Sequence, residues 1–159
     1  MTEIGDNAFR DWRSLEEMVF PTGSRLEKIG AHALAGTALQ WFVAPKNLKT
    51  IGAGAFAGCK SLREVKLNEG LEQLGGDGEG VFQDSAIVAA YVPSTLREFR
   101  METFSGCKNL RKVEVAEGCR LGIRQCLPPS VAVVVSAEAP LAGGSPDSIW
   151  SQASPGPAV

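Results

Sequence analysis

The chain has 159 residues and a formal net charge of -2 at neutral pH, from 16 basic and 18 acidic residues. Hydrophobic residues make up 44% of the sequence and charged residues 21%, as in an ordinary globular domain. Acidic and basic residues are interspersed, which argues against nucleic-acid binding, and no apolar run approaches the ~18 residues of a membrane-spanning helix.

From residue 4 onward, a phrase of about two dozen residues is repeated five times. Each copy places small, aromatic and aliphatic residues at similar offsets from an opening apolar residue. The copies begin at Ile4, Ile29, Ile51, Leu74 and Phe99, with separations of 25, 22, 23 and 25 residues. A period of this length that preserves apolar residue type predicts a solenoid of stacked coils, which argues against an enzyme.

The third copy shows how one coil is expected to fold. Residues 62–67 alternate apolar and polar side chains, which predicts a strand with Val65 and Leu67 facing the core and Glu64 and Lys66 facing outward. The strand of each coil is expected to pair in parallel with the next, and the first strand is expected near residues 17–20. Turns follow the strands, and three of them begin with proline, at Pro21, Pro45 and Pro93.

The rest of the coil is expected to bend sharply and then form a short helical turn. The spacing of Ala55, Phe56 and Cys59 favours a helical turn that buries one face. A glycine follows the opening aliphatic residue in four copies, and we interpret it as a bend that tolerates no side chain, with a positive φ. These glycines are Gly5, Gly30, Gly52 and Gly75.

Residues 51–67 read I-G-x-x-A-F-x-x-C-x-x-L-x-x-V-x-L, and other copies continue into proline. This pattern resembles the BspA-type leucine-rich repeat, also called the Treponema pallidum type, over about residues 4–127. The resemblance implies an α/β repeat solenoid of about five to six coils, with a parallel β-sheet on its concave face and short helical turns or loops opposite. It also implies a non-catalytic protein, because many family members are surface or secreted proteins that bind other proteins. The sequence departs from the motif where Trp12, Gly36 and Asp84 stand in place of the repeat cysteine.

The repeat pattern ends before the chain does. Residues 131–135 form an uncharged apolar run that predicts a closing strand on a sixth rung, which the tail, a partner or further coils of a longer protein would cover. We assign residues 1–135 to the solenoid and residues 136–159, which are rich in proline, glycine and serine, to a flexible tail. Ile149 and Trp150 in that tail are either incidental or a short docking motif.

The four cysteines are interpreted mainly as free thiols. Cys59 and Cys107 occupy one repeat position two coils apart, roughly 10 Å from each other by strand spacing, which exceeds the ~7 Å limit of a disulfide. We expect them to pack as small hydrophobic residues. Cys119 and Cys126 flank a short loop and offer an alternative disulfide. With one histidine in the chain, a zinc site is not expected, and no cofactor is predicted.

Two segments invite a chemical interpretation. The glycine-rich residues 75–80 lack the lysine and hydroxyl of a phosphate-binding loop, and Asp77 and Glu79 would repel phosphate, so we interpret them as an insertion between coils. His32 is expected to be a surface residue without general-base geometry. A hydrolase or nucleotide-binding enzyme is therefore disfavoured, and no catalytic or metal-binding residue is assigned.

The outward face of the predicted sheet is the candidate functional surface. Stacking aligns Val19, Val43, Lys66, Tyr91 and Glu114 in one row and Glu17, Trp41, Glu64, Ala89 and Lys112 in a second. We expect Trp41, Val43 and Tyr91 to face solvent, because repeat proteins bind partners along such surfaces and exposed aromatics act as anchors. The residues expected to contact a protein partner are Trp41, Val43, Lys66, Tyr91 and Glu114.

The predicted function is therefore non-catalytic protein binding, with adhesion at a cell surface as the form that the resemblance implies. The alternative is a structural spacer or fragment of a larger repeat protein without a ligand of its own. No secretory signal is expected in the opening residues, and the compartment stays open. End-to-end self-association through uncapped ends of the solenoid is a further expectation.

Overall fold

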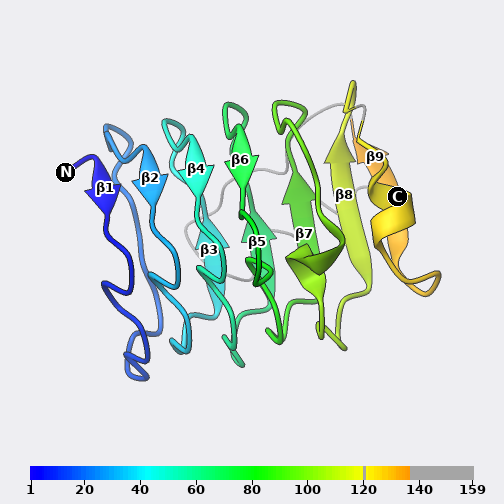
Figure 1. The fold of residues 1–159 in the computed structure, drawn as a ribbon. Helices are drawn as coiled ribbons and strands as arrows, with labels where there is room; N and C mark the ends of the chain where they lie inside the picture. Colours follow the sequence, from blue (N-terminus) through cyan, green and yellow to red (C-terminus); the bar gives the residue numbers. More distant parts are fainter. Residues whose placement is uncertain (120, 137–159) are drawn as a thin grey trace.

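A computed structural model describes residues 1–119 and 121–136 as a parallel β-solenoid of about six turns (Figure 1). Its elements, in chain order, are β1 (Glu3–Ile4), β2 (Lys28–Ile29), β3 (Trp41–Val43), β4 (Thr50–Ile51), β5 (Glu64–Lys66), β6 (Gln73–Leu74), β7 (Ala89–Val92), the 3-10 helix η1 (Met101–Phe104), β8 (Lys112–Ala116), the 3-10 helix η2 (Ile123–Cys126) and β9 (Ala132–Ser136). The predicted repeat solenoid is confirmed.

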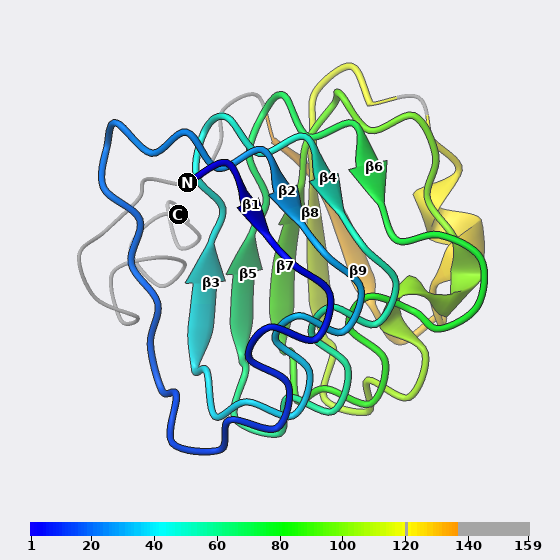
Figure 2. The same cartoon turned by 60° about the vertical axis from the view of Figure 1, so that its left-hand side comes forward.

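The coils build two parallel sheets rather than one. The predicted sheet contains five strands in the order β3-β5-β7-β8-β9. A second sheet, which the sequence analysis did not predict, contains the two-residue strands β1-β2-β4-β6. Figure 2 shows the two sheets as opposite layers of the solenoid. The short strands contain the opening residues of the first four repeats, so these residues pair with one another in a sheet separate from the five-stranded one.

The segments that connect the two sheets contain hydrogen-bonded turns, and the helices among the described residues are η1 and η2. In the first three coils, two residues in the left-handed conformation explain why the expected helical turns stay so short. In the third coil these residues are Gly54 and Gly58, with φ of 63° and 69°, and in the second they are His32 and Gly36, with φ of 56° and 70°. A right-handed helix cannot continue through a residue in this conformation.

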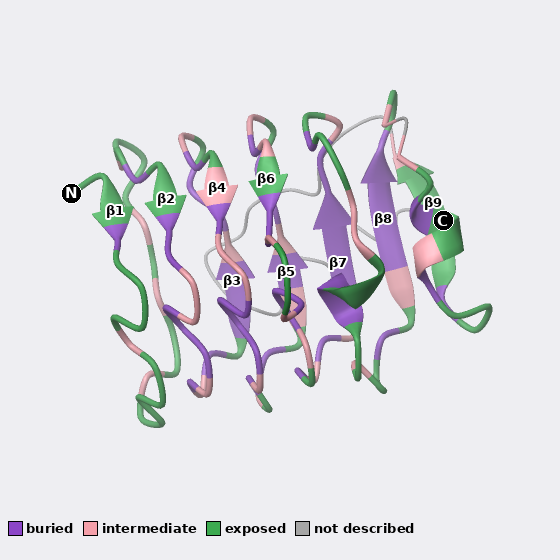
Figure 3. Ribbon diagram, viewed as in Figure 1, coloured by how far each residue is buried: buried purple, intermediate pink, exposed green. Residues whose placement is uncertain are grey.

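The core between the two sheets is a column of equivalent side chains. Ile51, Phe56, Leu62 and Leu67 of the third coil are completely buried and belong to one continuous cluster. The rings of Phe56, Phe82 and Phe104 from successive coils stack along the column, with centroid distances of 5.4 Å for both Phe56–Phe82 and Phe82–Phe104. The ring of Phe42, from β3, is tilted against Phe56 at 4.7 Å. In Figure 3 the buried segments run through the middle coils. Neighbouring coils therefore shield each other's apolar side chains, as predicted.

The recurrent glycines are required for a different reason than predicted. Only Gly75 of the four has a positive φ, of 84°. A Cβ atom on Gly52 would lie 2.6 Å from the backbone nitrogen of Ala31, and one on Gly30 would lie 2.6 Å from the backbone nitrogen of Asp6. A Cβ atom on Gly5, in the first described coil, would meet nothing within 4 Å. Close approach of successive backbones, rather than backbone conformation, therefore selects glycine at positions 30 and 52.

The first strand of the five-stranded sheet is β3, so the expectation of a strand at residues 17–20 is wrong. This segment forms no strand, although Met18 and Phe20 are half-buried against the core. A backbone hydrogen bond of 3.1 Å from Gln40 to Glu16 joins the two coils just ahead of β3. Among the described residues, the segment has a neighbouring coil on one side only, and a strand at such an edge is readily lost.

The cysteine position of the repeat also needs a correction. In the second and fourth coils, Thr37 and Ser85 hold the position of the repeat cysteine, not Gly36 and Asp84 as predicted. The Thr37 hydroxyl lies 3.5 Å from the Cys59 sulfur, and the Ser85 hydroxyl lies 3.4 Å from the Cys107 sulfur. The Cys59 thiol donates to the carbonyl of Leu34 in the preceding coil at 3.2 Å. The position thus takes small side chains that bridge coils.

All four cysteines are free thiols, so the alternative of a Cys119–Cys126 disulfide is not realised. Burial raises the pKa of both Cys59 and Cys107 above the usual value.

The predicted closing strand is confirmed as β9, which pairs in parallel with β8 over its whole length. Residues 137–159, with the predicted tail and its Ile149-Trp150 pair, lie outside the described residues.

Candidate functional site

The strand register places the predicted contact residues on one face of the five-stranded sheet. Val43 pairs with Lys66, Lys66 with Tyr91, and Tyr91 with Glu114, so these residues form one row. Trp41, Glu64, Ala89 and Lys112 form the second row. We call the surface formed by these two rows the outer sheet face. Val19 and Glu17, which were expected to start the rows, lie outside the strands.

The aromatic residues of the outer sheet face are buried, so the expectation that they face solvent is wrong. Trp41 is 5% exposed and Tyr91 is 2% exposed, whereas Val43 and Lys66 are half-buried. Trp41 and Tyr91 belong to a second apolar cluster that includes Ala89 and Ala116 and is separate from the core. The outer sheet face is therefore not a simple polar surface: β3 and β7 bury apolar side chains on both of their faces.

Charged groups surround this second cluster. The Lys112 ammonium lies 3.7 Å from a carboxylate oxygen of Glu114 on the same strand, and Glu114 is itself buried. Burial lowers the pKa of Lys66, because the neutral amine loses less hydration than the ammonium. Burial also raises the pKa of Tyr91 to about 12, and the nearby carboxylates of Glu69 and Glu114 act in the same direction. The phenol is therefore neutral at physiological pH.

Tyr91 is the single tyrosine of the chain, so its ionisation can be observed directly. We expect the ultraviolet phenolate absorbance of the folded protein to rise with a midpoint at about pH 12, against about 10 after unfolding in urea. Because folding raises this pKa, the associated stability is complete below pH ~10 and is lost as the pH rises toward 12. A midpoint near 10 in the folded protein would contradict the burial of Tyr91.

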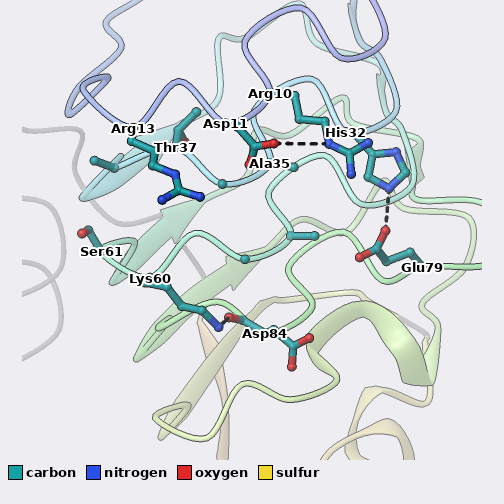
Figure 4. Close-up of a pocket in the computed structure, with 14 residues that line it drawn as sticks. Arg10, Asp11, Arg13, His32, Ala35, Thr37, Lys60, Ser61, Glu79 and Asp84 are labelled. Carbon is teal, nitrogen blue, oxygen red and sulfur yellow. Dashed lines mark hydrogen bonds and ion pairs between the residues drawn. The ribbon is translucent and has the colours of Figure 1, made fainter.

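A polar groove of about 590 Å³ lies on another side of the solenoid (Figure 4). Its lining comes from four coils and includes Arg10, Asp11, Arg13, His32, Lys60, Glu79 and Asp84. His32, expected at the surface, is half-buried, and its Nε2 lies 2.5 Å from the Oε2 of Glu79. The sequence analysis missed this groove because no single repeat contains it.

The glycine-rich insertion is held by its acidic residues. Glu79 contacts His32 of the second coil, and Asp77 forms an ion pair with Arg100 at 3.0 Å. Glu79 thus links the insertion to the second coil and Asp77 links it to the fifth, which supports the structural interpretation of residues 75–80. Among residues 1–119 and 121–136, no group of three metal-ligating side chains is found. The described part of the chain likewise contains no helix long and apolar enough to span a membrane.

Comparison with known proteins identifies the repeat. A sequence model described as the BspA type leucine rich repeat region matches residues 1–111 in six copies. The search of curated proteins gave no match.

Three solved structures are similar. The pneumococcal vaccine antigen PcpA is 20% identical with a TM-score of 0.63, over 87% of this chain and 34% of that one. A leucine-rich repeat protein from Bacteroides ovatus is 16% identical with a TM-score of 0.31, over 86% and 52% of the two chains. A leucine-rich cell surface protein from Faecalibacterium prausnitzii is 14% identical with a TM-score of 0.34, over 87% and 58%. The chain thus spans about a third of the pneumococcal structure and somewhat more than half of the other two.

Proposed function

Because this chain belongs to the BspA-type leucine-rich repeat family, we propose that it is a non-catalytic module that binds a protein partner through the outer sheet face. Many members of the family act at cell surfaces, and the proposal includes adhesion there. The residues proposed to form the contact site all belong to the two rows of the outer sheet face. Val43 and Lys66 are its accessible members, and Trp41, Tyr91 and Glu114 are buried beside them and shape the surface that a partner meets.

The observation that supports this proposal is the second apolar cluster. Parallel strands in a solenoid need apolar residues on the side that faces the core, but Trp41 and Tyr91 lie on the opposite side. Large aromatic residues combined with half-buried charged neighbours are the usual composition of a protein-binding hot spot. Val43 and Lys66 border the cluster and keep part of their surface accessible, so a partner would contact them first.

The test uses a phage-displayed library of random peptides as the source of ligands. Peptides selected on the purified protein are expected to lose affinity by at least about tenfold on Lys66→Glu, because charge reversal beside an apolar anchor opposes binding. Trp41→Ala combined with Tyr91→Ala should weaken the same peptides. Lys108→Glu, on an exposed turn, is the matched control and should bind normally. Peptides that bind all folded variants equally would contradict the assignment.

A structural spacer within a larger repeat array is the second candidate function. It is favoured by the apolar side chains that the first coil leaves accessible, in a groove of about 560 Å³. For a spacer, the library selection should give no peptide that depends on the outer sheet face. Fusion of a folded BspA-type coil ahead of residue 1 should then raise the unfolding temperature, because it covers this groove.

A further inference from the structure

One backbone position repeats through the first five coils and lines up the residues that follow it. It has a left-handed conformation in each of these coils, with φ between 58° and 74°. In the first four of them its amide donates to a carbonyl of the next coil, at distances of 2.7–2.9 Å. Because these hydrogen bonds fix the register, residues two places further along are also aligned from coil to coil. The position is held by Asp11, Gly36, Gly58, Asp84 and Gly106.

The aligned residues alternate between a cation and an alanine. In chain order they are Arg13, Ala38, Lys60, Ala86 and Lys108. The three cations are exposed and the two alanines are half-buried. Adjacent coils are about 4.8 Å apart, so the cations recur at intervals of roughly 10 Å along the solenoid. We call Arg13, Lys60 and Lys108 the cation row.

The cation row runs along the polar groove. Arg13 and Lys60 line this groove, and Figure 4 shows both of them apart from the contact between His32 and Glu79. Lys108 lines a second pocket, of about 450 Å³. Small residues of the groove lining leave room for a ligand between the cations: Ala35, Gly36, Ala38, Ala57 and Gly58.

No carboxylate of the described residues 1–119 and 121–136 forms an ion pair with the cation row. The Lys60 ammonium donates to the backbone carbonyl of Asp84 at 2.7 Å, which positions the ammonium but leaves its charge uncompensated. By contrast, Lys28 and Arg97 lie within 3 Å of glutamate oxygens. The row therefore offers three positive charges to an anionic ligand.

Two carboxylates beside the cation row decide which anionic ligand fits. The Asp11 carboxylate lies over Gly36 of the next coil, where it would clash with a Cβ atom. The Asp84 carboxylate lies over Gly106 in the same way. Ionised carboxylates accept hydrogen bonds and repel other anions, so the surface favours a ligand with hydroxyl donors between its anionic groups. An acidic polysaccharide has such hydroxyls, whereas the side chains of an acidic peptide bring acceptors alone.

We propose that the cation row and the polar groove bind a linear acidic polysaccharide. Its carboxylate or sulfate groups pair with Arg13, Lys60 and Lys108, and they recur at the roughly 10 Å interval of alternate coils. Hydroxyl groups of the sugars between them donate to Asp11 and Asp84. The groove lies on another side of the solenoid than the outer sheet face, so this site does not depend on the proposed partner-binding function.

Isothermal titration calorimetry on the full chain tests the proposal with oligosaccharides of hyaluronan, which carries carboxylates, and of chondroitin sulfate, which also carries sulfates. We expect at least one of the two to bind, with an affinity that falls as the salt concentration rises. Neutral dextran and poly-glutamate should bind at least about tenfold more weakly. Binding of both acidic oligosaccharides identifies the carboxylate as the recognised group, and binding of chondroitin sulfate alone identifies the sulfate.

Charge reversal locates the site. Arg13→Glu, Lys60→Glu and Lys108→Glu should each lower the affinity for the oligosaccharide by about tenfold, and none should lower the unfolding temperature appreciably, because all three side chains are exposed. Lys46→Glu is the matched control, since Lys46 is an exposed lysine that does not line the groove. Lys66→Glu on the outer sheet face should bind the oligosaccharide normally, even where it loses the selected peptides.

The proposal is overturned if neither acidic oligosaccharide binds the folded chain, or if poly-glutamate binds as tightly as they do. Equal losses in Lys46→Glu and Lys60→Glu also overturn it, because net charge alone would then account for the binding. A loss in Lys66→Glu, with Lys60→Glu unaffected, places the oligosaccharide on the outer sheet face and contradicts the groove as its site.

Discussion

Replacing Phe56 with alanine is expected to lower the free energy of unfolding by about 4 kcal/mol, within the range of about 3–5 kcal/mol for a buried phenylalanine. The Phe56 ring is completely buried and lies 4.7 Å from the ring of Phe42 and 5.4 Å from that of Phe82. Its removal interrupts the column that joins the second, third and fourth coils. Urea denaturation followed by circular dichroism measures the loss.

Phe9→Ala is the matched control, because Phe9 holds the same repeat position in the first coil. Phe9 is only half-buried and stacks on the exposed Trp12 at 5.4 Å. We expect its removal to cost less than half as much, since a partly solvated side chain loses less transfer free energy and leaves no closed cavity. Equal losses at positions 9 and 56 would contradict the stacked arrangement of the coils.

Substituting Gly52 with alanine is expected to destabilise the protein by about 3 kcal/mol, at the upper end of the usual cost of overpacking. The new methyl group would lie 2.6 Å from the backbone nitrogen of Ala31 and 2.9 Å from its Cα atom. Backbone atoms cannot rotate away as a side chain can, so the second and third coils would have to separate. The thermal unfolding temperature and the urea midpoint should both fall.

Gly5→Ala is the control for this prediction. Gly5 begins the equivalent bend of the first coil, and a Cβ atom there would meet nothing within 4 Å. The variant should retain wild-type stability or gain a few tenths of a kcal/mol, because alanine restricts the unfolded chain more than glycine does. If Gly5→Ala and Gly52→Ala were equally destabilising, the glycines would be required for backbone conformation, and contact between coils would not explain them.

Some parts of a coil could be predicted from the residue types along the chain, and others could not. Alternating apolar residues predict the strands that contain Val65 and Val113, because the side-chain period of two is a local property of extended backbone. The closing strand with Val133 was predicted from an uncharged apolar run. The short second sheet was missed, since two-residue strands are too brief to show a period. The glycine at position 52 was noticed, but its cause was not, because the clash involves a residue of another coil.

The candidate site was likewise predicted only in part. Its row of Val43, Lys66, Tyr91 and Glu114 was predicted correctly, since aligning the repeated motif also aligns the strands that it contains. The burial of Trp41 and Tyr91 was not predicted, because exposure depends on which side chains of other coils pack around a ring. The contact between His32 and Glu79 was missed for a similar reason: the two residues are 47 positions apart and meet through an insertion that occurs in one coil only.

The amino-acid sequence by itself determined that this chain is a repeat solenoid of the BspA type and which residues share a face, because both follow from a period along the chain. Only the tertiary structure decided which of those residues are accessible and why glycine is needed between coils. The physical reason is that one coil cannot bury its own apolar side chains. Burial is therefore a property of neighbouring coils, and equivalent residues such as Phe9 and Phe56 differ in burial although they hold the same repeat position.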